Sequence, residues 1–155
     1  DNDERAIFFA RGVLETVKKL RWAPDIIHCH GWISHILPIY LKKAYIDDPI
    51  FSGSKIVTSL YGDTPTMPFA PEFRELVKFG NITDADTELL AEPSGINLAK
   101  LAVRYSDGVI IGDGDVSAEL TGFCAAEGLP LLPFDAAAME NGSYIDAYNR
   151  FYDSL

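Results

Sequence analysis

Short apolar segments of this chain alternate with segments whose apolar residues recur every three or four positions. The apolar segments 25–30, 55–61 and 107–112 are rich in β-branched residues and bounded by turn residues, as buried parallel strands are. Parallel strands need long crossovers, which the helical segments between them can supply. The alternation predicts an α/β fold with an open, mostly parallel, Rossmann-like sheet and helices on both faces.

Helical periodicity predicts where these crossovers lie. Asp1 and Glu4 have the spacing of a capping box and predict a first helix that Pro24 ends. A helix with Pro38 in it should be kinked there or begin there, and Asp115 is the expected N-cap of a later helix that Gly128 closes. The expected helices after the first cover 33–44, 72–78, 97–104, 116–126 and 141–155, and a short strand is expected within 129–134.

Length and composition limit the classes of function. The 155 residues suffice for one domain, so we expect 1–155 to form a single unit. Twenty-three acidic against thirteen basic residues give a net charge of −10, which disfavours nucleic acid and anionic membranes as partners. Two cysteines without a CxxC spacing, no signal-peptide pattern and no long apolar run predict a cytoplasmic chain that does not cross a membrane.

Three histidines within eight residues raise the question of a metal site. On a strand, His28 and His30 point to the same face, but His35 follows a turn, and no cysteine or carboxylate lies nearby at a familiar ligand spacing. We therefore expect neither metal nor cofactor. His30, beside Gly31 at the strand end, is the candidate for a substrate contact, and His28 is the structural one.

In a parallel sheet, ligands bind beyond the carboxyl ends of the strands, here 28–32, 60–63 and 112–115. Segment 112–115 reads Gly-Asp-Gly-Asp, whose aspartates would repel a phosphate. Asp63 either binds a hydroxyl-rich ligand or caps its own turn. Four aromatic residues either line a sugar-stacking surface or belong to the core: Trp32, Tyr40, Tyr61 and Phe69.

The motif Trp-x-Pro-Asp-Ile-Ile-His-x-His-x-Trp at 22–32, with collinear matches at 3–11, 37–42 and 54–58, resembles bacterial glycogen synthases and plant starch synthases, glycosyltransferase family five. The resemblance implies a partial GT-B fold, with this chain as the N-terminal, acceptor-side lobe, closest to a short bacterial version that ends after that lobe. The family transfers glucose from ADP-glucose to an α-1,4-glucan without a metal. The resemblance places the opening strand before Asp1 and the ADP-glucose site in a second lobe.

Two departures bear on activity. The resemblance implies an aspartate at Gly31 and a histidine at Leu60, and neither residue present can replace those polar groups. We therefore expect this chain to be inactive alone and to bind ADP-glucose only with a second lobe. The alternative is a non-catalytic member that binds glucan or another protein. Substrate-binding candidates are His30, Trp32, Tyr61 and Asp63; an exposed sheet edge would favour a homo-oligomer.

Overall fold

The computed structural model describes residues 2–155, so the predicted cap Asp1 lies outside the described residues. Its centre is a four-stranded, all-parallel sheet in the order β1-β2-β3-β4. The strands are β1 (Ile26–His30), β2 (Lys55–Leu60), β3 (Gly108–Ile111) and β4 (Leu131–Leu132). The predicted α/β fold with an open parallel sheet is therefore confirmed.

The helices follow the predicted segments, with differences in detail. The α-helices are α1 (Asn2–Leu20), α2 (Leu37–Ile39), α3 (Phe73–Val77), α4 (Gly95–Arg104), α5 (Ala118–Glu127), α6 (Ala136–Asn141) and α7 (Tyr144–Asp153). The described residues also form two 3₁₀ turns, η1 (Trp32–Ser34) and η3 (Glu88–Ala91), and one π-helical turn, η2 (Tyr40–Ala44). None of the helices described here is both long and apolar enough to cross a membrane.

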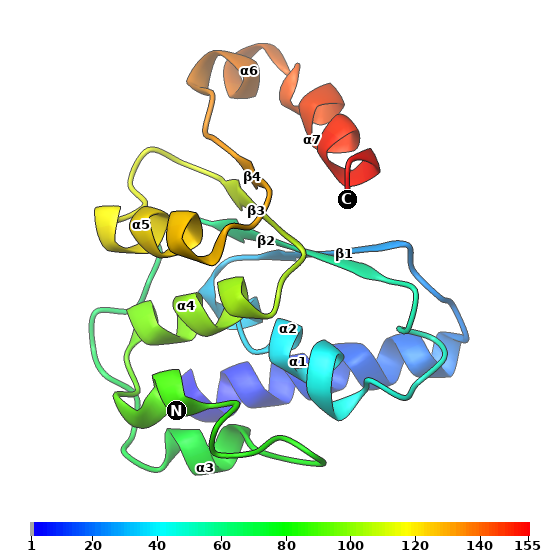
Figure 1. The fold of residues 1–155 in the computed structure, drawn as a ribbon, viewed down its shortest axis with the longest axis vertical. Helices are drawn as coiled ribbons and strands as arrows, with labels where there is room; N and C mark the ends of the chain where they lie inside the picture. Colours follow the sequence, from blue (N-terminus) through cyan, green and yellow to red (C-terminus); the bar gives the residue numbers. More distant parts are fainter. Residues whose placement is uncertain (1) are drawn as a thin grey trace.

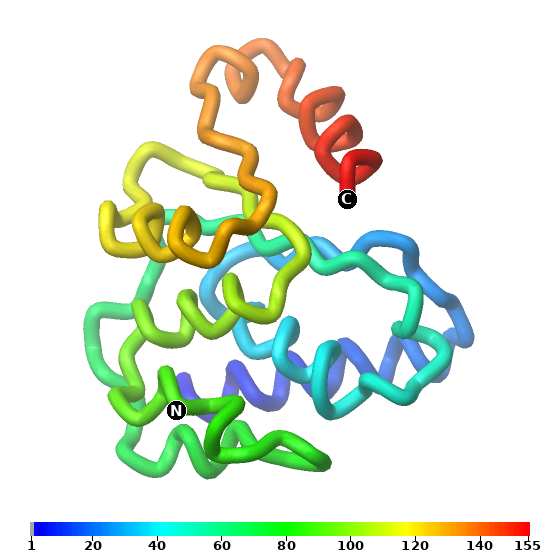
Figure 2. Tube along the Cα trace, viewed as in Figure 1, coloured from blue at the N-terminus to red at the C-terminus, as the bar shows by residue number. Residues whose placement is uncertain are grey.

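The two faces of the sheet are covered unequally. Because the strands follow one another in spatial order, right-handed crossovers bring all the connecting helices to one face. Helices α1, α2, α4 and α5 pack there, and α7 lies on the opposite face (Figure 1). The chain trace in Figure 2 shows how the segment after β4 crosses over to reach that second face. Of the polar side chains on that second face, Ser59 is buried, His28 is half-buried and His30 is exposed.

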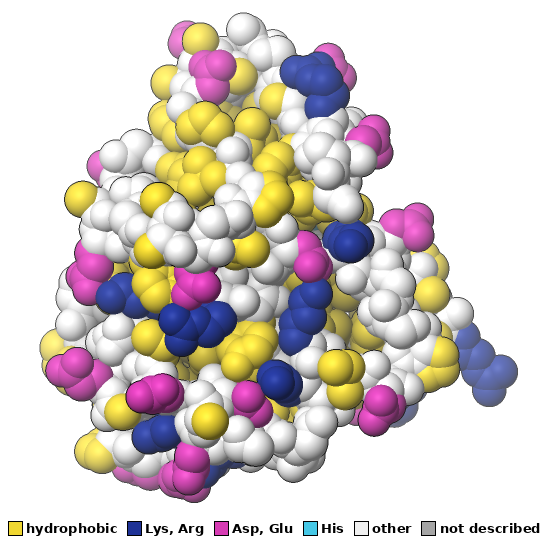
Figure 3. Space-filling model, in the orientation of Figure 1, with side chains coloured by type: hydrophobic (Ala, Val, Ile, Leu, Met, Phe, Trp, Pro, Cys, Tyr) yellow, Lys and Arg dark blue, Asp and Glu magenta, His cyan; other side chains and the backbone are white. Residues whose placement is uncertain are grey.

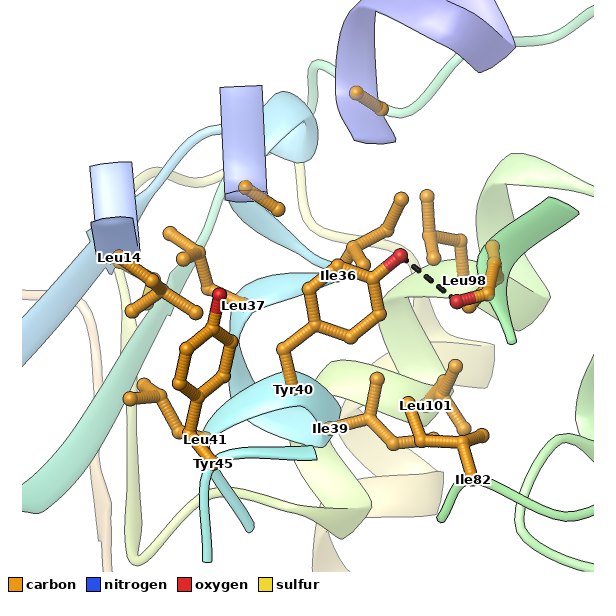
Figure 4. Packing of buried hydrophobic residues seen from close by; sticks show 14 of the residues in the cluster. Leu14, Ile36, Leu37, Ile39, Tyr40, Leu41, Tyr45, Ile82, Leu98 and Leu101 are labelled. Carbon is orange, nitrogen blue, oxygen red and sulfur yellow. Dashed lines mark hydrogen bonds between the residues drawn. The ribbon is translucent and has the colours of Figure 1, made fainter. Parts of the chain in front are cut away.

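The main core lies between α1, the segment after β1 and α4 (Figure 4). Tyr40 is fully buried at its centre, and its hydroxyl donates a 2.8 Å hydrogen bond to the carbonyl oxygen of Val77. Phe69 is buried and stacks on Phe73, with 4.5 Å between ring centroids. Of the four aromatic residues weighed as a sugar-stacking surface, Tyr40 and Phe69 are thus core residues.

Three local predictions need correction. The single helix expected over 33–44 is divided into η1, α2 and η2, and Pro38 lies in the first turn of α2, where a proline needs no amide hydrogen. The single helix expected over 141–155 starts only at Tyr144, and a separate α6 precedes it.

The N-cap of α5 is Ser117, whose hydroxyl accepts a hydrogen bond from the Leu120 amide, so Asp115 is not the cap.

One edge of the sheet is formed by β1. Within the described residues, β1 pairs with β2 on one side and has no strand on the other. Residues on an edge strand have backbone donors and acceptors that no neighbouring strand uses. Within the described residues β1 is thus an edge strand, and its exposure to and pairing with a second copy stay predictions.

Candidate functional site

The carboxyl ends of three neighbouring strands meet at one edge of the sheet. His30 ends β1, Tyr61 follows β2, and Gly112 follows β3. The parallel register sets these three positions side by side, because His30 pairs with Ser59 and Leu60 with Ile111. This is the edge at which open α/β sheets bind ligands.

The loops after β1 and β2 are joined by a carboxylate. Oδ2 of Asp63 accepts a hydrogen bond from the backbone amide of Trp32 at 3.0 Å. The same oxygen lies 3.3 Å from the point where a Cβ on Gly31 would be. Gly31 has φ = 75°, a conformation that favours glycine. The carboxylate of Asp63 therefore lies beside the position at which the family resemblance implies an aspartate.

Two stacked histidines lie on the partly covered face of the sheet. The ring centroids of His28 and His30 are 3.9 Å apart, which confirms that both side chains point to one face. His28 is held on both nitrogens, by the Tyr152 hydroxyl at 2.5 Å and the Ser59 hydroxyl at 2.6 Å. Nδ1 of His30 contacts the Tyr61 hydroxyl at 2.9 Å. His28 thus has a structural setting, whereas His30 is exposed at the strand end.

Loss of solvation favours the neutral form of both imidazoles. The pKa of His28 is lowered to about 4, mainly by burial and then by the neighbouring His30, and burial also lowers the pKa of His30. A neutral imidazole offers one donor and one acceptor nitrogen. The pair can therefore exchange hydrogen bonds with hydroxyl groups at neutral pH.

The Tyr61 ring is positioned by the glycine that follows β3. A Cβ added to Gly112 would lie 2.3 Å from the Tyr61 ring, so only glycine leaves room for the ring there. The Gly112 amide donates to the Leu60 carbonyl at 2.7 Å, and Asp113 accepts from the Gly62 amide at 2.9 Å. These contacts hold the loops after β2 and β3 together and fix the phenol beside His30.

The structure also places three other residues that the sequence drew attention to: Trp32, Leu60 and Cys29. Trp32 is half-buried and packs against the main core, with its ring tilted towards that of Phe69 and 5.9 Å between the ring centroids. Leu60 is 1% exposed and packs with α4 and α5, on the face opposite His30. The position at which the resemblance implies a histidine is therefore filled by a core side chain. Cys29 is buried, and burial raises the pKa of its thiol to about 12, so it is no nucleophile.

The site carries no positive side chain in the strand-end segments 28–32, 60–63 and 112–115, but it carries Asp63, Asp113 and Asp115. No group of three or more metal-binding side chains occurs among the described residues. Such a surface suits a neutral, hydroxyl-rich ligand better than a phosphate.

Sequence reasoning missed three members of this site. Ser59, Tyr148 and Tyr152 surround His28, through the two hydrogen bonds already given and a 5.8 Å ring contact with Tyr148. Tyr148 and Tyr152 lie more than a hundred residues away in sequence, on a helix predicted only as amphipathic. No local pattern could have placed them against β1.

An open, all-parallel α/β sheet with hydrogen-bonding groups at its carboxyl edge defines a Rossmann-like domain. The family model described as starch synthase catalytic domain matches residues 1–129. The chain belongs to this family, as its resemblance to glycogen and starch synthases predicted.

Similar proteins agree with this membership. The glycogen synthase of Clostridium perfringens is 30% identical over 159 aligned residues, which cover all of this chain and 33% of that protein. The glycogen synthase of Elusimicrobium minutum is 34% identical over 127 residues, 78% of this chain and 25% of the relative. The glycogen synthase of Chlorobium phaeovibrioides is 31% identical over 121 residues, which cover 77% of this chain and 24% of that protein. The chain spans about a third or less of these relatives. No solved structure matches it significantly.

Proposed function

We propose that this chain is an acceptor-side member of the glycogen synthase family that binds a neutral α-1,4-glucan at the carboxyl edge of its sheet and does not transfer glucose by itself. The observation that carries this proposal is the uncharged His30–Tyr61 pair, which lies at the strand end that Trp32 follows in the chain and has no basic group in the strand-end segments.

The chemistry of these groups matches that of a glucan. Sugar hydroxyls need partners that both donate and accept, as a neutral imidazole and a phenol do. The apolar faces of glucosyl rings pack on aromatic side chains, and the half-buried Trp32 ring lies close to the same strand end. Asp63 is exposed, and its Oδ1 atom makes no hydrogen bond within the described residues, so it can accept from a sugar hydroxyl.

The same geometry argues against transfer by this chain alone. A retaining transfer from ADP-glucose must stabilise positive charge on the sugar and negative charge on the leaving phosphate. Gly31 has no side chain, and Leu60 is buried on the other face of the sheet. The strand ends offer no Lys or Arg for the phosphate. ADP-glucose should therefore bind only when a second lobe supplies these groups.

Affinity electrophoresis through glycogen gels tests the proposal with a matched pair of variants. The chain has two tryptophans, Trp32 at the site and Trp22, which is 62% exposed in the link before β1. We expect glycogen to retard the wild type, Trp32→Ala to lose most of the retardation, and Trp22→Ala to keep it. If glycogen leaves wild-type migration unchanged, the glucan proposal is wrong and a protein-binding role is favoured.

A transfer assay tests the second half of the proposal. Incubation of the purified chain with ADP-glucose and glycogen should give no glucose incorporation above that of an empty preparation. Turnover that disappears in His30→Ala would show that catalysis survives without polar side chains at positions 31 and 60, and would contradict the proposal.

A further inference from the structure

A cleft lies between the ends of β3 and β4 and the two C-terminal helices α6 and α7. Its volume is about 550 Å³, within the range of small-ligand sites. The side chains that define its chemistry are Ile111, Leu132, Phe134, Met139, Tyr144 and Tyr148. Hydrophobic side chains gather below α6 in the same region of Figure 3.

The lining combines apolar and aromatic groups without a usable charge. Among the described residues, no Lys or Arg lines the cleft and Asp135 is its one carboxylate; it accepts a 3.1 Å hydrogen bond from the Ala138 amide as the N-cap of α6. Tyr144 and Tyr148 form an edge-to-face pair with 5.4 Å between ring centroids. A phosphate-bearing ligand would find no partner here, whereas a neutral ligand with apolar faces and hydroxyl groups would.

The cleft adjoins the candidate site at the sheet edge. Ile111, which lines the cleft, is followed directly by Gly112, against which the Tyr61 ring rests. Tyr148 lines the cleft, and its ring centroid lies 5.8 Å from that of His28. The His28 ring in turn stacks on that of His30. A chain-like ligand bound at His30 and Tyr61 can therefore continue into the cleft.

We propose that this cleft is a second subsite, which holds a glucosyl segment of a neutral α-glucan between α6 and α7. The inference rests on the proposed glucan binding and assigns a place to a further part of the same ligand. The cleft lies largely in segment 130–155, beyond the residues that the family model matches.

The methionines of the chain give a direct test. There are two, Met139 in the cleft and Met67, which is 77% exposed in the loop after β2. In the chain labelled with ¹³C-methyl methionine, titration with maltoheptaose should shift the Met139 methyl signal in a saturable way. An equal concentration of sorbitol serves as the control for non-specific solvent effects and should leave the signal in place.

Variants of residues that line the cleft, compared with a variant of a residue outside it, test whether the Met139 shift arises from binding in the cleft. Ala137→Trp, at an exposed position of α6, should fill the cleft and weaken the maltoheptaose-induced Met139 shift at least fivefold. Tyr144→Ala should weaken it similarly, whereas Ile145→Ala, at the next and 55% exposed residue of α7, should not. The Ala137→Trp variant should still unfold cooperatively, which excludes loss of the fold as the cause.

The outcomes for the two proposals are distinct. A Met139 signal that stays still while glycogen retards the wild type would overturn the subsite and leave glucan binding at Trp32 intact. A Met139 shift with undiminished retardation of Trp32→Ala would support the subsite and overturn the role of Trp32. If neither effect occurs, both proposals are wrong. A Met139 shift produced by an amphipathic peptide but not by maltoheptaose would also overturn the subsite.

Discussion

The carboxylate of Asp63 accepts a hydrogen bond from the backbone amide of Trp32 at 3.0 Å, which ties the loop after β2 to the first turn after β1. The two residues are 31 positions apart, so this is no local turn contact. The bond places a carboxylate oxygen beside Gly31. Its donor, the Trp32 amide, belongs to the first residue of η1. Two loops at the sheet edge thus share one carboxylate.

Replacement of Asp63 should measure this contact. Asp63→Ala removes the acceptor of the Trp32 amide, and we expect the free energy of unfolding to fall by about 1 kcal/mol. Asp63→Asn keeps an acceptor oxygen and should lose less. Urea unfolding monitored by tryptophan fluorescence gives both values. Asp47→Ala is the control, because Asp47 is exposed and makes no side-chain hydrogen bond within the described residues; an equal loss there would contradict the interpretation.

A pair of glycines in one loop tests the packing of Tyr61. In Gly112→Ala the new methyl group would meet the Tyr61 ring, so we expect a loss of about 1–3 kcal/mol in unfolding free energy and weaker glycogen retardation. Gly114 lies two residues further on, and no atom of the described residues lies within 4 Å of a Cβ added there, so Gly114→Ala should change neither quantity. Similar stabilities for the two variants would show that Tyr61 does not rest against Gly112.

The stability of the chain should depend on pH through His35. This side chain is 2% exposed, and neither ring nitrogen has a hydrogen-bond partner among the described residues. Burial lowers its pKa to about 4, against a smaller opposing effect of Asp63. The unfolded chain, with a histidine pKa of about 6.5, binds more protons between pH 6.5 and 4. As far as His35 determines it, the free energy of unfolding is therefore highest above pH 6.5 and falls as the pH drops from 6.5 towards 4.

His35→Leu should reduce this dependence. The gap between 6.5 and about 4 corresponds to about 3 kcal/mol for His35, and His28 adds to the loss in the same direction. The variant should lose the His35 part of the slope and gain about 1 kcal/mol at pH 7, because it removes two unpartnered buried nitrogens. Urea unfolding at pH 7.0 and 4.5 measures both effects; an unchanged difference between the two pH values would contradict the assignment to His35.

The charge of the strand ends predicts how the chain responds to nucleotides. Asp63, Asp113 and Asp115 lie there without a Lys or Arg in the same segments, so a diphosphate would be repelled. Calorimetry with ADP-glucose should show no saturable binding up to roughly millimolar ligand, where a binding free energy of about −4 kcal/mol would register. A low-micromolar dissociation constant would show that this chain holds a nucleotide site of its own.

Much of the fold could be predicted because its signals are local. The strand around His28 and that around Val57 are short apolar runs between turn residues, and Gly128 closes α5 in the left-handed conformation that its place after a helix predicts. The family motif at 22–32 likewise lies within one contiguous segment. Such patterns depend on neighbours a few positions apart, and the sequence displays these directly.

The tertiary structure alone decided which residues meet at the sheet edge. Asp63 reaches Trp32, Tyr152 reaches His28, and His35 is buried with no hydrogen-bond partner in the described part of the chain, although nothing near these residues in sequence distinguishes them. The sequence also does not determine which face of the sheet α7 covers. An amphipathic pattern identifies the apolar face of a helix and not the surface that this face will contact. These contacts arise from the packing of elements far apart in the chain, so their physical cause is the long-range geometry of the folded core.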